Sequence, residues 1–440
     1  MSRSTAMAVV LIGLVAVTLA AQDRETKVRT DRTRIESDGF WIYNDLAAGV
    51  ERAKKTNKPL LVVFRCIPCE HCAQLDEKVV ERDPVVQSLL SQFVCVRIVH
   101  ANGMDLSLFQ FDYDQSWAAF LMNADLTIYG RYGTRSDRKE SSQDVSLDGF
   151  AKALTGALDL HKQYPLVKEG LAAKRGPASQ ISVPEELPSL KGKFGSKLDY
   201  DGAVVKSCIH CHQVGEGLRQ VHRAAEKGIS DHVLYPYPHP KSLGLIMDPK
   251  EKATVSSVEP DTLAAKSGFR AGDQFVSLER QPLLSIADIQ WVLHNTGDSA
   301  KLDAEILRDG KPQSLQLVLD KGWRQLGDIS WRSTTWELRR MANGGIEFED
   351  VPDAERKQAG LDETDLALRI RHVGQYKPHD VAKQAGFLKG DVLVSFQGNT
   401  DRMTETQLLA RLIKNQRAGD RVPVTVMRDG KKVDLKIPVQ

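Results

Sequence analysis

Residues 59–72 read PLLVVFRCIPCEHC. The run from Pro59 to Phe64 is short and almost wholly apolar, which predicts a buried strand of a parallel sheet. Cys69 and Cys72 follow this strand as a Cys-x-x-Cys pair, and a helix is expected to begin there. Backbone amides and the helix dipole at a helix N-terminus favour thiolate over thiol. This stretch therefore predicts an α/β domain with reactive cysteines.

The order strand, Cys-x-x-Cys, helix resembles a thioredoxin-like site. The resemblance implies that the Cys69 thiolate attacks a disulfide and that Cys72 resolves the mixed disulfide. His71 lies between the two cysteines, and its positive charge favours the thiolate, whereas the negative charge of Glu70 opposes it. The sign of the net effect stays open.

Two features depart from the thioredoxin-like pattern. Cys66 is an extra cysteine that could pair with Cys69 or help to hold zinc with a histidine, while an iron–sulfur cluster lacks its fourth cysteine. Ala118 stands where thioredoxins carry a cis-proline. A cis bond before a non-proline residue costs roughly 2.5–4 kcal/mol, so a trans bond is predicted. Cys95, in an apolar strand, is predicted to be a buried and inert thiol.

The thioredoxin-like domain is expected to span residues 38–163. Its other elements are a helix over 45–55, a second strand over 93–99, a hairpin over 118–129 and a closing helix over 147–160. The fold class expected for the whole chain is multidomain, α/β plus α+β.

The N-terminus has the pattern of an export signal. Residues 1–21 contain Arg3, then an apolar run of about 15 residues and two small residues, whereas a bilayer span needs about 20. Residues 22–37 are charged and are expected to be a flexible leader. No later segment reaches the length of a membrane span, so a periplasmic or secreted protein with no span after signal cleavage is predicted. A formal net charge of +2 in 440 residues gives no reason to expect nucleic acid as a partner.

A second cysteine motif follows a linker predicted over residues 164–200. The small insert predicted over 201–242 contains Cys208-Ile-His-Cys211-His212, the attachment pattern of a c-type haem. Both thiols would bond to the haem and His212 would ligate iron. The candidates for a second iron ligand are His222, His232, His239 and Met247. A second redox pair, a structural disulfide and a metal site using His210 or His212 are the alternatives.

The C-terminal half contains an internal repeat. Residues 264–273 (AAKSGFRAGD) match residues 382–391 (AKQAGFLKGD) at an offset of 118, and a second match, LRDG at 307–310 against MRDG at 427–430, has an offset of 120. Two matched segments at nearly equal offsets predict two copies of one domain. We expect them over residues 243–320 and 345–440, joined by a packed connector over 321–344.

Each copy resembles a PDZ domain of the bacterial HtrA type. The resemblance implies that a protein or peptide C-terminus adds to the domain as a strand, with its carboxylate held by backbone amides. The implied carboxylate loop of the first copy follows Ser242 and comprises Leu243, Gly244, Leu245 and Ile246. In the second copy the matching strand is expected at 366–370, without a glycine between its apolar residues. The alternative is that the two PDZ domains pack on each other and bind nothing.

The combination of parts resembles a bacterial family of exported thioredoxin–PDZ proteins, some of which use selenocysteine. It implies a thiol–disulfide oxidoreductase or redox sensor with a redox partner protein, whose PDZ domains recruit protein clients. The alternatives are a PDZ scaffold with structural or metal-holding cysteines and a haem electron carrier. HtrA-like proteolysis is not expected, because the chain has no Gly-x-Ser-x-Gly motif.

Overall fold

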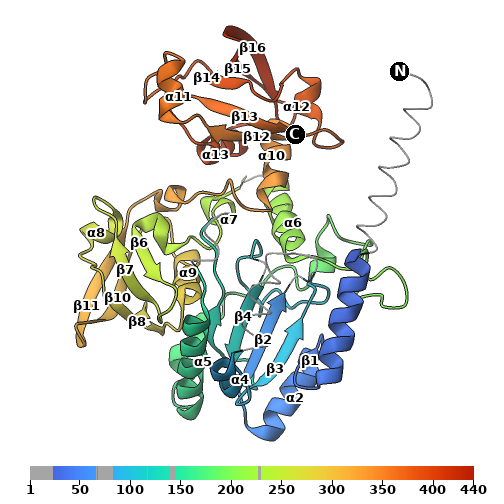
Figure 1. Cartoon of the computed structure of the whole chain (residues 1–440), viewed down its shortest axis with the longest axis vertical. Helices are drawn as coiled ribbons and strands as arrows, with labels where there is room; N and C mark the ends of the chain where they lie inside the picture. The colour runs from blue at the N-terminus through green and yellow to red at the C-terminus, as the bar shows by residue number, and fades with distance from the viewer. Residues whose placement is uncertain (1–22, 66, 68–82, 116, 138–143, 226–228) are drawn as a thin grey trace. The chain divides into compact units, whose positions relative to one another are not determined.

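A computed structural model describes residues 23–65, 67, 83–115, 117–137, 144–225 and 229–440 (Figure 1). The chain divides into two compact units. The first comprises Met1–Gly217 and Tyr237–Trp323, and the second comprises Leu218–Pro236 and Arg324–Gln440. No helix of the described residues is long and apolar enough to cross a membrane.

The N-terminal part of the first unit is built around a five-stranded sheet with the order β1-β3-β2-β4-β5. The central strand β2 pairs in parallel with β3 and antiparallel with β4, which continues through a hairpin into the edge strand β5. The predicted strands, the hairpin and the helices over 45–55 and 147–160 are confirmed, with small differences at their ends, whereas the helix expected to begin at Cys69 lies outside the described residues. The elements are β1 (Ile42–Tyr43), α2 (Leu46–Thr56), β2 (Leu60–Arg65), α4 (Pro84–Leu90), β3 (Val94–Ile98), β4 (Trp117–Met122), β5 (Ile128–Tyr132) and α5 (Leu147–Lys162).

Both faces of this sheet are covered, which explains why β2 is apolar along its whole length. Leu61 and Val63 pack with α4 and α5 in one hydrophobic core. The opposite face carries Leu60 and Val96, which lie so close to α2 that a Cβ on Gly49 would stand 2.3 Å from the Val96 side chain. All six residues of β2 are buried. The strand is thus fixed on both sides up to its last residue.

Two segments predicted as flexible or linking are ordered. The leader prediction was wrong, because residues 23–38 are helical and bury Val28, Asp31 and Ile35. Because most of its residues are charged, the sequence did not reveal the apolar face of the helix that packs on the sheet. The segment 164–200 also packs on the first unit, through the short helices η2 (Glu169–Lys174) and η3 (Pro184–Glu186) and the buried side chain of Leu187.

The first PDZ repeat forms a sheet with the order β11-β10-β8-β7-β6, with β9 paired to β8. The short strand β6 lies at the sheet edge, and α9 is the helix of this repeat that corresponds to the PDZ helix beside the groove. The elements are η4 (Pro240–Leu243), β6 (Leu245–Asp248), β7 (Thr254–Val258), α8 (Leu263–Lys266), β8 (Gln274–Leu278), β9 (Gln281–Pro282), α9 (Ile286–His294), β10 (Ala300–Arg308) and β11 (Lys311–Leu319).

Helix α9 packs against β5 of the thioredoxin-like part, and its side chains also bond to η2. At the centre of this contact Asp288 accepts hydrogen bonds from the Arg131 amide (3.1 Å) and from the Lys174 ammonium (2.8 Å). The Arg131 guanidinium lies over the Trp291 ring at 3.8 Å, and the Trp291 indole donates to the Ala173 carbonyl (3.0 Å). These groups are buried, so the thioredoxin-like part and the first PDZ domain share one packed interface.

Small residues allow this close approach. A Cβ on Gly130 of β5 would stand 2.7 Å from the Leu284 side chain, and one on Gly149 of α5 would stand 2.1 Å from the Pro249 carbonyl. The first PDZ domain therefore belongs with the thioredoxin-like part in one unit, rather than with the second PDZ domain.

The second unit contains the second PDZ repeat, with the sheet order β12-β13-β14-β15-β16. Ile329, Leu338 and Met341 of the predicted connector lie in its hydrophobic core, which confirms that the connector is packed. The elements are α7 (Asp231–Leu234), α10 (Thr335–Asn343), β12 (Ile346–Asp350), α11 (Asp353–Gln358), β13 (Leu368–Val373), α12 (Val381–Gln384), β14 (Val392–Phe396), α13 (Glu405–Asn415), β15 (Arg421–Arg428) and β16 (Lys431–Pro438).

The residues that revealed the repeat form the same ion pair in both copies. Arg308 donates from Nε and from a terminal nitrogen to Asp273 at 2.7 Å each, and Arg428 makes the same two bonds of 2.7 Å to Asp391. A two-point arginine–carboxylate pair fixes geometry as well as charge. The Gly-Asp and Arg-Asp-Gly signatures are therefore two halves of one contact.

The predicted insert over residues 201–242 is not a domain of its own. Its first part belongs to the first unit, whereas Ile229, Leu234 and Tyr235 lie in the core of the second PDZ domain. Helix α6 (Cys211–Ala224) runs across the division between the two units. A segment this short has too little apolar surface for a core of its own, so it adds to existing cores.

The buried pair Lys174–Asp288 gives a test of the packed interface. Both side chains are 0% exposed, and burial lowers the pKa of Lys174. Asp288→Ala leaves a buried charge uncompensated and is expected to lower the free energy of unfolding by about 3–5 kcal/mol. Asp159→Ala, which removes the exposed partner of Lys162, should cost less than about 0.5 kcal/mol. Equal urea-unfolding curves for the two variants would contradict the packed interface.

Candidate functional site

The carboxyl edge of the thioredoxin-like sheet is where the first cysteine motif enters. β2 ends at Arg65, and its parallel neighbour β3 ends at Ile98, so both strands deliver their following loops to this edge. Cys66, Cys69, His71 and Cys72 lie outside the described residues, and their predicted roles stay predictions.

A buried charged cluster lies beneath that edge. Asp31 accepts hydrogen bonds from Arg97 (2.9 Å) and from the Tyr43 hydroxyl (3.0 Å), and Arg65 approaches the same carboxylate at 3.5 Å. Burial raises the pKa of Asp31, while Arg65 opposes the rise. Burial and Asp31 also raise the pKa of Tyr43, which therefore stays a neutral donor. Two guanidinium groups thus lie beneath this edge, and a positive charge near a cysteine favours its thiolate.

Ala118 lies inside β4, opposite Phe64 of β2, and Trp117 lies opposite Arg65. The cis bonds of the described residues are those before Pro165 and Pro378, so the bond between Trp117 and Ala118 is trans as predicted. Ala118 is thus a strand residue with its backbone in the ladder.

The loop of Cys208 and Cys211 is fastened to the residues that follow β3. The Ala101 amide donates to the Ile209 carbonyl (2.8 Å), and the Ile209 amide donates to Asn102 Oδ1 (2.8 Å). Asn102 Nδ2 in turn donates to the Ser207 carbonyl (2.9 Å). Ile209 is fully buried. The second cysteine motif is therefore held at the carboxyl edge of β3.

An apolar cluster brings the two motifs to the same edge. Ile67, the residue after Cys66, packs with Val28, Val99 and Val204. Val99 follows β3, and Val204 comes four residues before Cys208 in the chain.

The two thiols of the second motif differ in environment. Cys208 and Cys211 are both partly exposed, and the Cys208 thiol donates weakly to the Ile209 carbonyl, 3.7 Å away. Cys211 is the first residue of α6, and burial followed by the influence of Cys208 raises its pKa to about 12. Burial and Cys211 together raise the pKa of Tyr113, whose hydroxyl donates to the Phe109 carbonyl (3.0 Å).

The histidines of this motif are engaged with neighbouring groups. The rings of His210 and His212 stack with centroids 5.6 Å apart, and His212 Nδ1 lies 3.2 Å from Glu216 one turn along α6. Burial lowers the pKa of His210 to about 4, so this ring is neutral at physiological pH. Among the described residues, no group of three or more His, Cys, Asp or Glu side chains gathers to hold a metal.

A c-type haem was predicted on Cys208, Cys211 and His212, with a second iron ligand from four candidates. His222 is ten residues beyond His212 on α6, about 15 Å along the axis, and cannot share one iron with it. His239 accepts from the Lys241 amide and lies 3.8 Å from Asp144. Met247 is in the core of the first PDZ domain, and His232 belongs to the second unit. The haem on Cys208, Cys211 and His212 and its second iron ligand stay predictions.

The predicted peptide site of the first PDZ domain has the expected backbone. Leu243 ends η4, Gly244 has the left-handed φ of +89°, and Leu245 and Ile246 begin the edge strand β6. A Cβ on Gly244 would stand 2.1 Å from the Thr262 hydroxyl, so this position requires glycine. Within the part of the chain that the structure describes, no side chain accepts a hydrogen bond from the amides of Leu245 or Met247.

The same amides are covered by side chains in the second PDZ domain. Asn343 Oδ1 accepts from the Gly345 amide (3.2 Å) and the Ile346 amide (2.8 Å). Glu405, the first residue of α13, accepts from the Phe348 amide (2.9 Å) across the space that a peptide strand would occupy. Arg339 holds Glu405 through two bonds of 2.9 and 2.6 Å. The second groove is therefore filled by the protein's own polar groups.

The strand predicted to bind peptide in the second copy was misplaced. Residues 366–370 enter β13, an interior strand that corresponds to β7, whereas the edge strand is β12. The error arose because an insertion containing α11 separates β12 from β13. The glycines thought to be missing are Gly344 and Gly345, directly before β12, and Asn343 before them was the overlooked signal.

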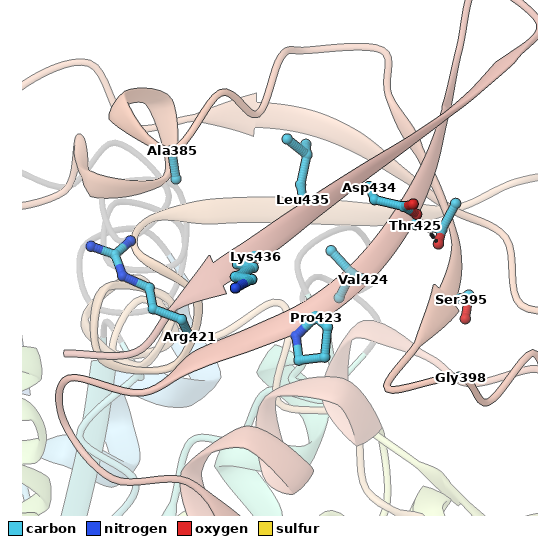
Figure 2. Close-up of a pocket in the computed structure, with 10 residues that line it drawn as sticks. All are labelled: Ala385, Ser395, Gly398, Arg421, Pro423, Val424, Thr425, Asp434, Leu435 and Lys436. Atoms are coloured by element: carbon cyan, nitrogen blue, oxygen red, sulfur yellow. Dashed lines mark hydrogen bonds between the residues drawn. The ribbon is translucent and has the colours of Figure 1, made fainter.

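The second PDZ domain also has an open hollow of about 760 Å³ on the outer face of its sheet (Figure 2). The Thr425 hydroxyl donates to Asp434 at 2.7 Å across its floor, and Arg421 and Lys436 lie at one end. None of the predicted site residues lines it. The lining residues are Ala385, Ser395, Gly398, Arg421, Pro423, Val424, Thr425, Asp434, Leu435 and Lys436.

Comparison with known proteins identifies the parts. A thioredoxin-like family model matches residues 41–124, and a PDZ domain model matches residues 231–319 and 345–439. The chain thus combines a thioredoxin-like domain with two PDZ domains, as predicted.

Curated relatives are periplasmic serine endoproteases. A probable DegP-like endoprotease of Pseudomonas savastanoi pv. phaseolicola is 27% identical over 43% of this chain and 38% of its own length. The pH-dependent endoprotease DegQ of Escherichia coli is 27% identical over 38% of this chain and 32% of its own length. The matches span less than two fifths of these relatives. The HtrA-type protease AlgW with a decapeptide is 16% identical with a TM-score of 0.21, over 32% of this chain and 49% of that chain.

The contrast between the described thiols predicts an order of alkylation. Cys208 is expected to react with iodoacetamide before Cys95 at pH 8, because Cys208 is partly exposed and Cys95 is buried. Cys211, with its pKa near 12, and the buried Cys95, whose pKa burial also raises, should react at least about tenfold more slowly. Peptide mapping by mass spectrometry of the folded protein follows each site. Equal rates at Cys208 and Cys95 would contradict the environments described here.

Proposed function

We propose that this protein, a thioredoxin-like domain joined to two PDZ domains, is an exported thiol–disulfide oxidoreductase or redox sensor that recruits protein clients. The observation that carries the proposal is the position at which the central strand β2 ends. It delivers the cysteine motif to the carboxyl edge of a thioredoxin-type sheet, directly after Arg65.

The proposed chemistry is thiol–disulfide exchange at Cys69 and Cys72. The Cys69 thiolate attacks one sulfur of a client disulfide, and Cys72 then displaces the client thiolate from the mixed disulfide. The guanidinium groups of Arg65 and Arg97 support this role, because a positive charge near a cysteine lowers the free energy of its thiolate. His71 adds to it when protonated.

Client recruitment is assigned to the first PDZ domain. Its edge strand β6 keeps the amides of Leu245 and Met247 uncovered by side chains, as the addition of a peptide strand requires. The name of the AlgW structure, a protease with a decapeptide, supports a peptide ligand for this fold. A periplasmic location is supported by the export signal and by the names of the periplasmic relatives. Disulfides persist in that compartment.

Removal of the attacking sulfur tests the proposed chemistry. Cys69→Ser is expected to reduce insulin turbidity formation with dithiothreitol to the rate of dithiothreitol alone, because serine cannot form the mixed disulfide. Cys95→Ser is the matched control, since the Cys95 thiol is buried and free, and it should keep the wild-type rate. Equal rates for wild type and Cys69→Ser would contradict the proposed oxidoreductase activity and favour the alternative, a peptide-binding scaffold.

Matched glycine substitutions test which PDZ domain binds peptide. A fluorescein-labelled C-terminal peptide library is expected to yield ligands that bind one site per chain and need a free carboxylate. Gly244→Val should weaken binding at least about tenfold, or 1.4 kcal/mol, because the carboxylate loop cannot form. Gly345→Val places equal strain in the second loop, where a Cβ would stand 2.1 Å from the His379 carbonyl, and should leave binding unchanged. Two sites per chain would contradict the filled second groove.

A further inference from the structure

We propose, on the premise that the first PDZ domain recruits clients as proposed above, that the thioredoxin-like domain ends its peptide site. Strand pairing with β6 then stops at the third residue from the client's C-terminus. The partner is a flexible C-terminal tail, recognised through its last residues alone. Three successive positions decide this, and they are Leu245 and Met247 in β6 and Pro249 directly after it.

The register of β6 shows which of its residues face the free edge of the sheet. Val255, which lies opposite Met247, uses its amide and its carbonyl for bonds on the side away from β6, at 2.8 Å each. The backbone groups of Met247 therefore point away from β7. Because this direction alternates along a strand, Leu245 also faces the free edge, and the next position to face it is Pro249.

Pro249 has no backbone group left for a peptide. Proline lacks the N–H, so this residue cannot donate to a peptide carbonyl. Its own carbonyl already accepts a hydrogen bond from the Ser146 hydroxyl at 2.7 Å. An antiparallel ladder between a peptide and β6 therefore ends at Met247.

The first turn of α5, in the thioredoxin-like domain, adjoins this end of the ladder. Ser146 is the N-cap of α5, and a Cβ on Gly149 would stand 2.1 Å from the Pro249 carbonyl oxygen. Tyr132 of β5 holds the turn in place, because its hydroxyl accepts from the Ser146 amide (3.0 Å) and donates to the Ser146 carbonyl (2.6 Å). The barrier after β6 is thus fixed to the thioredoxin-like sheet.

The period of two residues along a strand converts these positions into peptide positions. With its terminal residue beside Leu245, a bound peptide has its third residue from the end opposite Met247. Its fifth residue from the end would reach Pro249 and meet the first turn of α5. The chain before that residue must leave the sheet edge, so a flexible C-terminal tail fits the site and a long strand of a folded client does not.

Backbone N-methylation of a ligand tests where the pairing ends, using the full chain. An N-acetylated ten-residue ligand with a free carboxylate, taken from the peptide library, is methylated at the third or the fifth amide nitrogen from its C-terminus. Methylation at the third residue should weaken binding at least about tenfold, because this N–H pairs with the Met247 carbonyl. Methylation at the fifth residue should change the affinity less than about twofold.

Fluorescence anisotropy competition measures both effects. Equal losses at the two positions, or a loss at the fifth residue alone, would overturn the proposal. A peptide of the last four residues should compete within about twofold of the ten-residue ligand, since it contains every paired position. A tenfold advantage of the longer peptide would also overturn it.

A photoreactive residue tests the role of the thioredoxin-like domain. Benzoylphenylalanine at the fifth residue from the end of the ligand is expected to cross-link to residues 147–152 of α5, as identified by mass spectrometry. The same label at the second residue from the end is the control and should leave α5 unlabelled. Cross-links from the fifth residue that are confined to the first PDZ domain would overturn the assignment of the barrier to α5.

The two proposals fail in different ways. A library without any carboxylate-dependent ligand would contradict client recruitment and, with it, the site described here. A ligand that binds one site per chain, loses affinity in Gly244→Val and is equally sensitive at its third and fifth amides would leave recruitment intact. It would overturn only the end of the ladder at Met247.

Discussion

The parallel pairing of β2 and β3 is the constraint on which the chemistry of this protein depends. Parallel strands place their carboxyl ends together, so the loop after β2 and the loop after β3 share one edge of the sheet. Asn102 fastens this loop to the sheet, because its buried side-chain amide holds the loop of Cys208 and Cys211 against the end of β3. The end of β2, which the first cysteine motif follows in sequence, and the loop of Cys208 therefore lie at one edge of the sheet.

Helix α9 of the first PDZ domain both borders the peptide groove and packs on β5 of the thioredoxin-like domain. The helix that borders the peptide groove is the same helix that carries Asp288 and Trp291 into the thioredoxin-like interface. β5 continues through β4 to β2, the strand that leads to Cys69. A client held in the groove would therefore be presented by a domain that is packed on the redox domain. The two domains are not joined by a flexible linker, since Lys174, which lies in the segment predicted as a linker, is itself buried in the contact.

The sequence predicted those features that depend on local pattern. An apolar run predicted β2. Two repeated signatures predicted both PDZ domains, because Asp273 pairs with Arg308 in the first copy and Asp391 pairs with Arg428 in the second. Features that depend on distant contacts were missed. Asp31 stands in a charged helix that looked like a leader, and only tertiary packing against Arg97 shows its role. Composition also could not show that residues 201–242 are divided between two cores, because the insert has no periodicity of its own.

The two PDZ repeats show how one fold acquires two functions. The register of β6 on β7 and of β12 on β13 contains the same bulge, so Leu245 corresponds to Ile346 and Met247 to Phe348. At the two positions that decide access, Ser242 and Ile286 of the first copy are replaced by Asn343 and Glu405 in the second. The Asn343 amide oxygen and the Glu405 carboxylate accept hydrogen bonds from the Ile346 and Phe348 amides in place of a bound peptide. Because a buried amide must be paired, the second groove can accept a peptide only by breaking these bonds and the Arg339 ion pair. The filled groove therefore lies in the second repeat, whereas the repeat packed on the thioredoxin-like domain is the one for which peptide binding is proposed.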